Sequence, residues 1–83
     1  MRLYTDETTI GRAQDNDIVV PDEYVSRYEA VVRYTSGAFL LVLRQARNPV
    51  LLNQYRVEEV KQLLHGDELL MGRTLFHVII DHR

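Results

Sequence analysis

Residues 9–32 of the 83-residue chain read TIGRAQDNDIVVPDEYVSRYEAVV, and this stretch decides the fold. Short runs of β-branched residues alternate in it with clusters of turn formers, such as Asp15-Asn16-Asp17 and Pro21-Asp22. These residue types favour turns through their own backbone angles or through local side-chain hydrogen bonds. The alternation predicts an all-β sandwich of two mainly antiparallel sheets. Within the stretch, two arginines each follow a small residue, at Gly11-Arg12 and Ser26-Arg27.

The rest of the chain continues this pattern. Residues 29–34, 39–43 and 50–52 are predicted strands, and residues 68–71 are predicted to pair with residues 75–80. The unbroken apolar run at 39–43 favours a strand buried on both faces. We expect most of the core to come from Ile10, Ile18, Val20, Val32, Leu40, Val42, Leu52, Leu70, Phe76 and Val78.

Residues 57–66, VEEVKQLLHG, allow two interpretations. Val57, Val60, Leu63 and Leu64 lie near helical spacing, and Gly66 could cap a helix. A sandwich would instead use this segment as a loop that leads into a short strand. The sequence alone leaves both open.

Composition restricts the function. The chain is 46% hydrophobic and 27% charged, which is typical of a globular protein, and its length suits a single domain over residues 1–83. A net charge of −2 argues against a general nucleic-acid binder, although Arg27, Arg44, Arg47 and Arg56 could form a basic cluster. The absence of cysteine excludes disulfides and cysteine-based zinc sites.

No segment predicts a leader or a membrane span. The N-terminus lacks the apolar core of a signal peptide, and the apolar stretch Ala38–Leu43 is too short to cross a bilayer. We therefore expect a cytoplasmic protein without membrane contact.

Catalytic and metal chemistry find little support. The three histidines have no metal-ligand spacing, and Ser26 has no histidine in its motif to act as a base. Gly11 and Gly37 do not form a glycine-rich loop that could hold a nucleotide. We expect no enzyme activity, no metal and no cofactor.

Three segments together resemble the forkhead-associated (FHA) domain. Residues 9–30 are similar to the family's Ile-Gly-Arg, Asn-Asp-Ile and Val-Ser-Arg-x-His-Ala motifs. Residues 46–57, ARNPVLLNQYRV, and residues 63–78, LLHGDELLMGRTLFHV, resemble its later motifs in the same order. The resemblance implies a β-sandwich whose loops at one end bind phosphothreonine peptides or proteins.

The resemblance also implies a binding site. Arg12 and Ser26 match the phosphate contacts, Arg27 flanks them, and Asn48 matches an asparagine that hydrogen-bonds the ligand backbone. Arg47 replaces a threonine and would add a positive charge at the rim. Guanidinium groups suit a phosphate because they donate directional, charge-assisted hydrogen bonds.

The chain departs from the family pattern at several positions. Glu29 replaces the histidine that braces the binding loops, Ala46-Arg47 replaces Ser-Thr, and Pro49 replaces a glycine. The usual first strand has no clear counterpart, so we expect a trimmed domain or a sheet edge that is open or filled by a partner.

Alternative interpretations follow from these departures. Arg12 and Arg27 could pair with Asp15, Asp17 or Glu29 and hold no ligand. The domain could then be a degenerate relative that assembles proteins, or copies of itself, without phosphate.

Overall fold

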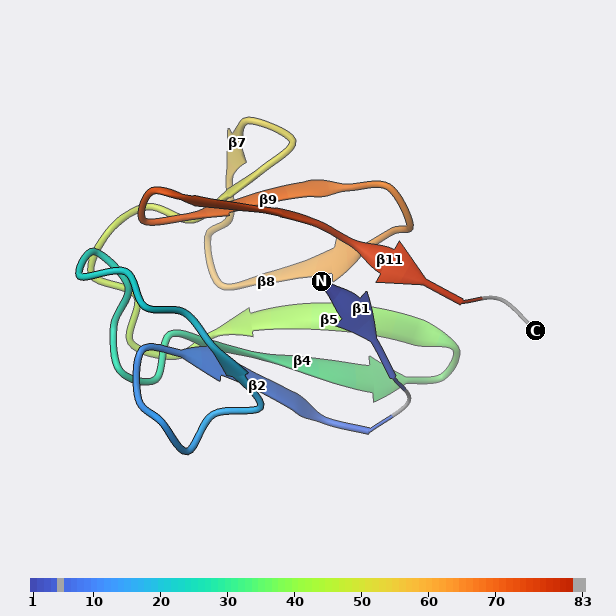
Figure 1. Cartoon of the computed structure of the whole chain (residues 1–83). Helices are drawn as coiled ribbons and strands as arrows, with labels where there is room; N and C mark the ends of the chain where they lie inside the picture. The colour runs from blue at the N-terminus through green and yellow to red at the C-terminus, as the bar shows by residue number, and fades with distance from the viewer. Residues whose placement is uncertain (5, 82–83) are drawn as a thin grey trace.

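The computed structural model describes residues 1–4 and 6–81, and this part of the chain forms strands, turns and loops without a helix (Figure 1). The strands are β1 (Arg2–Leu3), β2 (Thr8–Gly11), β3 (Ile18–Val19), β4 (Ala30–Thr35), β5 (Ala38–Leu43), β6 (Leu51–Leu52), β7 (Tyr55–Arg56), β8 (Val60–Leu63), β9 (Glu68–Met71), β10 (Thr74–His77) and β11 (Ile79–Ile80). The predicted all-β class is confirmed.

The strands form two layers. One sheet has the order β3-β2-β4-β5-β8 and the other has the order β10-β9-β6-β7. All neighbours in these two sheets are antiparallel except β2 and β3, which are parallel. Figure 1 shows the larger sheet below and the smaller sheet above, with the loops that connect them gathered at the left-hand end.

Local turn chemistry sets the register of the longest hairpin. Thr35 pairs with Ala38 across the β4–β5 turn, and the two residues between them, Ser36 and Gly37, both have positive φ. Two consecutive positive-φ residues match the twist of flanking strands in a two-residue hairpin. The turn therefore fixes which residues of β4 and β5 face each other along both strands.

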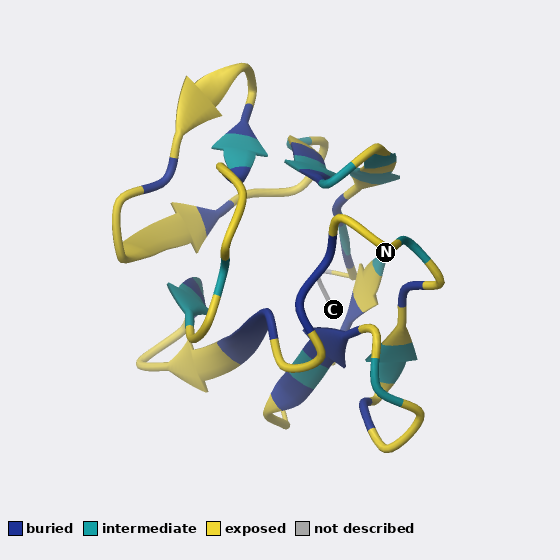
Figure 2. Ribbon diagram, turned by 90° about the vertical axis from the view of Figure 1, so that its left-hand side faces the viewer, coloured by how far each residue is buried: buried dark blue, intermediate teal, exposed yellow. Residues whose placement is uncertain are grey.

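The core lies between the two sheets. Five residues of the predicted core are buried in it, and Ile18 and Phe76 pack against it from partly exposed positions. The five are Ile10, Val20, Val32, Leu52 and Val78. Figure 2 shows these layers from the loop end, with buried segments inside and exposed loops around them.

Three predicted core residues were assigned to the wrong face. Leu40, Val42 and Leu70 are only partly buried, while Phe39, Leu41, Leu69 and Met71 fill the core in their place. Successive side chains of a strand point to opposite faces, so an error of one residue exchanges the faces. An unbroken apolar run gives no period from which to choose. The expectation that 39–43 is buried on both faces was also wrong.

The structure decides between the two interpretations of residues 57–66. Val60–Leu63 form β8, which pairs antiparallel with β5. Val60 and Leu64 are exposed, whereas Leu63 is buried. The near-helical spacing did not produce a helix because pairing with β5 satisfies the backbone and buries Leu63.

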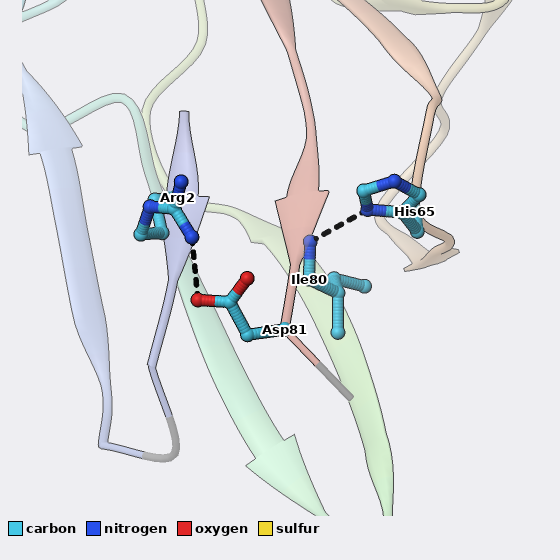
Figure 3. Close-up of polar contacts among 4 residues, drawn as sticks. All are labelled: Arg2, His65, Ile80 and Asp81. Atoms are coloured by element: carbon cyan, nitrogen blue, oxygen red, sulfur yellow. Dashed lines mark hydrogen bonds and ion pairs between the residues drawn. The ribbon is translucent and has the colours of Figure 1, made fainter. Parts of the chain in front are cut away.

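A short first strand is present at the end of the sandwich away from the loops. β1 pairs in parallel with β11, and Leu3 is buried in the core. Arg2 forms an ion pair with Asp81, and the backbone N–H of Ile80 donates to Nδ1 of His65 over 3.0 Å (Figure 3). The expected open edge at the N-terminus is therefore covered along Arg2–Leu3.

Candidate functional site

A cavity of about 360 Å³ lies among the loops at one end of the sandwich. The loop between β3 and β4 and the loop between β5 and β6 meet at this end (Figure 1). The residues that line the cavity are Arg12, Glu23, Tyr24, Val25, Ser26, Arg27, Tyr28, Gln45, Arg47 and Asn48. All five residues that the sequence pointed to are among them: Arg12, Ser26, Arg27, Arg47 and Asn48.

Arg12 is held against the β3–β4 loop by its backbone and by its side chain. Its N–H donates to the carbonyl of Ser26 over 3.0 Å, and its Nε donates to the carbonyl of Val25 over 3.1 Å. The outer nitrogens of the guanidinium remain available at the cavity. A guanidinium anchored through Nε is oriented in advance, which lowers the entropy cost of binding an anion.

Gly11 makes this close approach possible. A Cβ atom added at Gly11 would lie 2.1 Å from the carbonyl oxygen of Arg27, which no side chain could tolerate. Asn16 secures the same contact, because its Nδ2 donates to the carbonyls of Ala13 and Arg27 over 2.9 and 2.8 Å. Arg12 and Arg27 therefore come together through backbone contacts between their loops.

Glu29 lies beneath Ser26 and is fully buried. Its Oε1 accepts a hydrogen bond from the backbone N–H of Ser26 over 2.9 Å. Its Oε2 and the Oγ of Ser26 are buried without a hydrogen-bond partner in the described structure. Burial raises the pKa of the Glu29 carboxyl, and the hydrogen bond from the backbone N–H of Ser26 opposes this effect only in part.

Asn48 links the two loops that enclose the cavity. Its Nδ2 donates to the carbonyl of Tyr24 over 2.8 Å, while the residue itself remains exposed. Its side-chain oxygen has no partner among the described residues. Asn48 can therefore hold the β5–β6 loop in place and still accept a hydrogen bond from a ligand.

The arginines of the cavity form no ion pair within residues 1–4 and 6–81. The acids that could have neutralised them are engaged elsewhere. Asp17 accepts from Thr9 and Asp15 accepts from the hydroxyl of Tyr28, while Glu29 accepts from Ser26. The alternative of internal ion pairs is therefore wrong, and Glu23 is the acid that lines the cavity.

The sequence did not reveal the support behind Tyr24. The carboxylate of Asp22 accepts hydrogen bonds from the backbone N–H groups of Tyr24 and Arg73 and from the hydroxyl of Thr74, over 2.7–2.9 Å. Arg73 lies over the ring of Tyr24 at 4.4 Å from its centroid and also donates to the Tyr24 hydroxyl over 2.8 Å. In the sequence, only the Gly72-Arg73 dipeptide could have pointed to this contact between Arg73 and Tyr24, because it lies in residues 63–78, which resemble a motif of the FHA domain.

Other proposed chemistries gain no support. The described residues contain no group of three metal-binding side chains, and His82 lies outside them. The cavity includes Arg27 and Arg47 but not Arg44 or Arg56, so the basic cluster does not form one surface there. No helix in the described part of the chain is long and apolar enough to span a membrane.

Comparison with known proteins gives a consistent result. The family model of the FHA domain matches residues 8–72. The ABC transporter ATP-binding/permease protein Rv1747 of Mycobacterium tuberculosis is 39% identical over 64 residues, which are 76% of this chain. The chain spans about 7% of the length of that relative.

Solved structures share the architecture. Mycobacterium tuberculosis EmbR in complex with a low-affinity phosphopeptide has a TM-score of 0.84 and 31% identity, over 90% of this chain and 20% of EmbR. A structure from an analysis of phosphothreonine-dependent FHA domain interactions has a TM-score of 0.80 and 30% identity, over 88% of this chain and 75% of that one.

Proposed function

Because this chain belongs to the FHA domain family, we propose that it binds phosphothreonine-containing segments of other proteins. The phosphate would lie in the loop-end cavity against Arg12, Ser26 and Arg27, with Arg47 at the rim and Asn48 on the ligand backbone. The observation that carries the proposal is the set of arginines that line one cavity and form no ion pair with any residue that the structure describes.

The physical argument rests on charge and unmet hydrogen bonding. A phosphothreonine carries close to two negative charges at neutral pH, and guanidinium groups bind its oxygens with charge-assisted hydrogen bonds. Ser26 lines the cavity, but its hydroxyl is buried and has no hydrogen-bond partner among the described residues. Rotation about its χ1 would direct the hydroxyl to a phosphate oxygen. Tyr24 and Asn48 offer further surface for the residues beside the phosphothreonine.

The relatives support this ligand class. EmbR was solved with a phosphopeptide, and another neighbour belongs to a study of phosphothreonine-dependent interactions. Our chain differs from the family pattern at Glu29, whose carboxylate lies behind the cavity and is buried. A negative charge there would repel the phosphate, so we expect affinity to depend on the protonation of Glu29.

The test is a phosphothreonine peptide library followed by calorimetric titration of a selected peptide and its unphosphorylated form. We expect binding of the phosphorylated peptide alone. Arg12→Ala should weaken it by at least tenfold, since a charge-assisted hydrogen bond is worth about 1.5–3 kcal/mol. Arg56→Ala is the matched control, because Arg56 is an exposed arginine outside the cavity.

Absence of binding to every phosphothreonine peptide would overturn the proposal. Phosphate-independent protein assembly would then replace it as the function. Equal binding of both peptide forms would point to the same conclusion.

A further inference from the structure

Strand β8 ends the larger sheet, and its outer edge pairs with no other strand of the described chain. On the inner side, the N–H of Leu43 donates to the carbonyl of Glu59 over 2.9 Å. Hydrogen-bonded and non-hydrogen-bonded pairs alternate along antiparallel strands. The backbone groups of Lys61 therefore face β5, and those of Val60 and Gln62 face outward.

The outer face of this sheet carries a row of valines that ends at the open edge. Val31 of β4 pairs with Val42 of β5, and Val42 pairs with Val60 of β8. Exposure increases along the row, from 1% at Val31 to 53% at Val60. The row is thus an apolar strip that is buried at β4 and becomes exposed to solvent at the edge strand, β8.

The residues on either side of Val60 carry opposite charges. Lys61 of β8 points to the other face of the sheet. Glu59 precedes β8, but its carbonyl accepts the hydrogen bond from Leu43, so the pairing with β5 continues to Glu59 and places it on the same face as Lys61. Neither forms an ion pair within the described residues. A lysine on an edge strand by itself discourages pairing with another chain, unless an acid faces it.

We propose that β8 pairs antiparallel with β8 of a second copy of this chain, centred on Val60. Val60 would then face the second copy's Val60 in a hydrogen-bonded pair. Glu59 would face the second copy's Lys61 on both sides of the two-fold axis, in non-hydrogen-bonded pairs whose side chains lie closest. The valine row would continue across the axis into the valine row of the second copy.

The charges select this register among those that the outward backbone groups allow. A shift that centres the pairing on Lys61 places two lysines opposite each other, which is unfavourable. A shift that centres it on Gln62 leaves Glu59 and Lys61 without a charged neighbour and moves Val60 opposite Leu64. The Val60-centred register alone matches both charges and buries the valine row.

Charge reversal tests the pairing by sedimentation equilibrium of the whole chain. We expect a reversible dimer for the natural sequence. Glu59→Lys and Lys61→Glu should each weaken it about tenfold or more, because each places like charges together twice. The double variant Glu59→Lys/Lys61→Glu should restore it, because the opposite charges face each other again.

Glu68→Lys serves as the control, since Glu68 is exposed on β9 in the other sheet. It changes the net charge by the same amount as Glu59→Lys and should leave the dimer intact. A strictly monomeric natural chain at millimolar concentration would overturn the proposal. So would a double variant that is no better than the single variants.

The residues of the proposed dimer contact, Glu59 and β8, do not line the loop-end cavity. Phosphopeptide titration of Glu59→Lys should therefore match the natural chain, so failure of the dimer and failure of phosphopeptide binding give separate results.

Discussion

The carboxylate of Glu29 lies directly beneath Ser26, with its Oε1 2.9 Å from the Ser26 backbone nitrogen. The second Glu29 oxygen and the Ser26 hydroxyl are both buried without partners in the described structure. A buried acceptor without a donor costs free energy, and a buried charge costs more. Glu29 therefore supports the candidate site through Ser26, but its ionised carboxylate destabilises the folded chain.

Glu29→Gln should raise the free energy of unfolding at pH 7 by about 1 kcal/mol. Glutamine keeps an oxygen for the Ser26 N–H, adds an N–H donor for the Ser26 hydroxyl and carries no charge. Urea denaturation of both chains measures the difference, with Glu58→Gln as an exposed control. A loss of stability in Glu29→Gln would show that the ionised carboxylate is favourable.

The burial of Glu29 beneath Ser26 also predicts how the free energy of unfolding varies with pH. The pKa of Glu29 is raised in the folded chain, so the folded state holds its proton over a range where the unfolded state has lost it. Stability should therefore fall as pH rises from the ordinary carboxyl pKa through the raised one, and then level off. Glu29→Gln should not show this fall, and denaturation between pH 4 and pH 8 compares the two.

Glu29 substitution should also affect the ligand. Glu29→His or Glu29→Gln removes a negative charge behind the cavity, which should strengthen phosphothreonine peptide binding by about 1–2 kcal/mol. Calorimetric titration with one peptide measures the change. If neither variant nor the natural chain binds, the phosphate proposal is abandoned for this protein.

Asp22 should give the opposite pH response. Hydrogen bonds from the backbone of Tyr24 and Arg73 lower the pKa of its carboxyl. The stability that it contributes is present above the ordinary carboxyl pKa and is lost as pH falls through the lowered value. Asp22→Asn should be less stable than the natural chain at pH 7, and the difference should shrink in acid. A constant difference down to pH 2 would contradict this reading.

Gly11→Ala should destabilise the domain by about 3 kcal/mol or more, because the added Cβ meets the carbonyl of Arg27 at 2.1 Å. Gly66→Ala is the comparison, since Gly66 has φ of +89° and open space around it. That change should cost about 1 kcal/mol from backbone conformation alone. Thermal unfolding ranks the two, and an equal loss would mean that the loop at Arg27 can move aside.

Residues near one another in the chain could be interpreted correctly. Asp15-Asn16-Asp17 and Pro21-Asp22 marked turns because turn chemistry depends on the residues in and beside the turn. The order of the motifs over residues 9–78 predicted the family, the sandwich and the five cavity residues that the structure brings together.

Residues 39–43 and 57–66 were harder, because their apolar content suits more than one arrangement. Whether Leu41 or Leu40 faces inward depends on the sheet that covers β5. Whether Val60 belongs to a helix or a strand depends on its pairing with Val42. Neither partner is visible from the segment alone.

The sequence by itself determined where many of the turns lie, that the fold is an all-β sandwich, and which residue types could meet a phosphate. Only the tertiary structure decided that Glu29 is buried beneath Ser26, that Arg73 lies on Tyr24, and that the cavity arginines form no ion pair with an acid among residues 1–4 and 6–81. The reason is physical: turns and strand propensity depend on neighbouring residues. Burial, charge pairing and the facing of side chains depend on contacts between residues far apart in the chain, and these exist only after the sheets have packed.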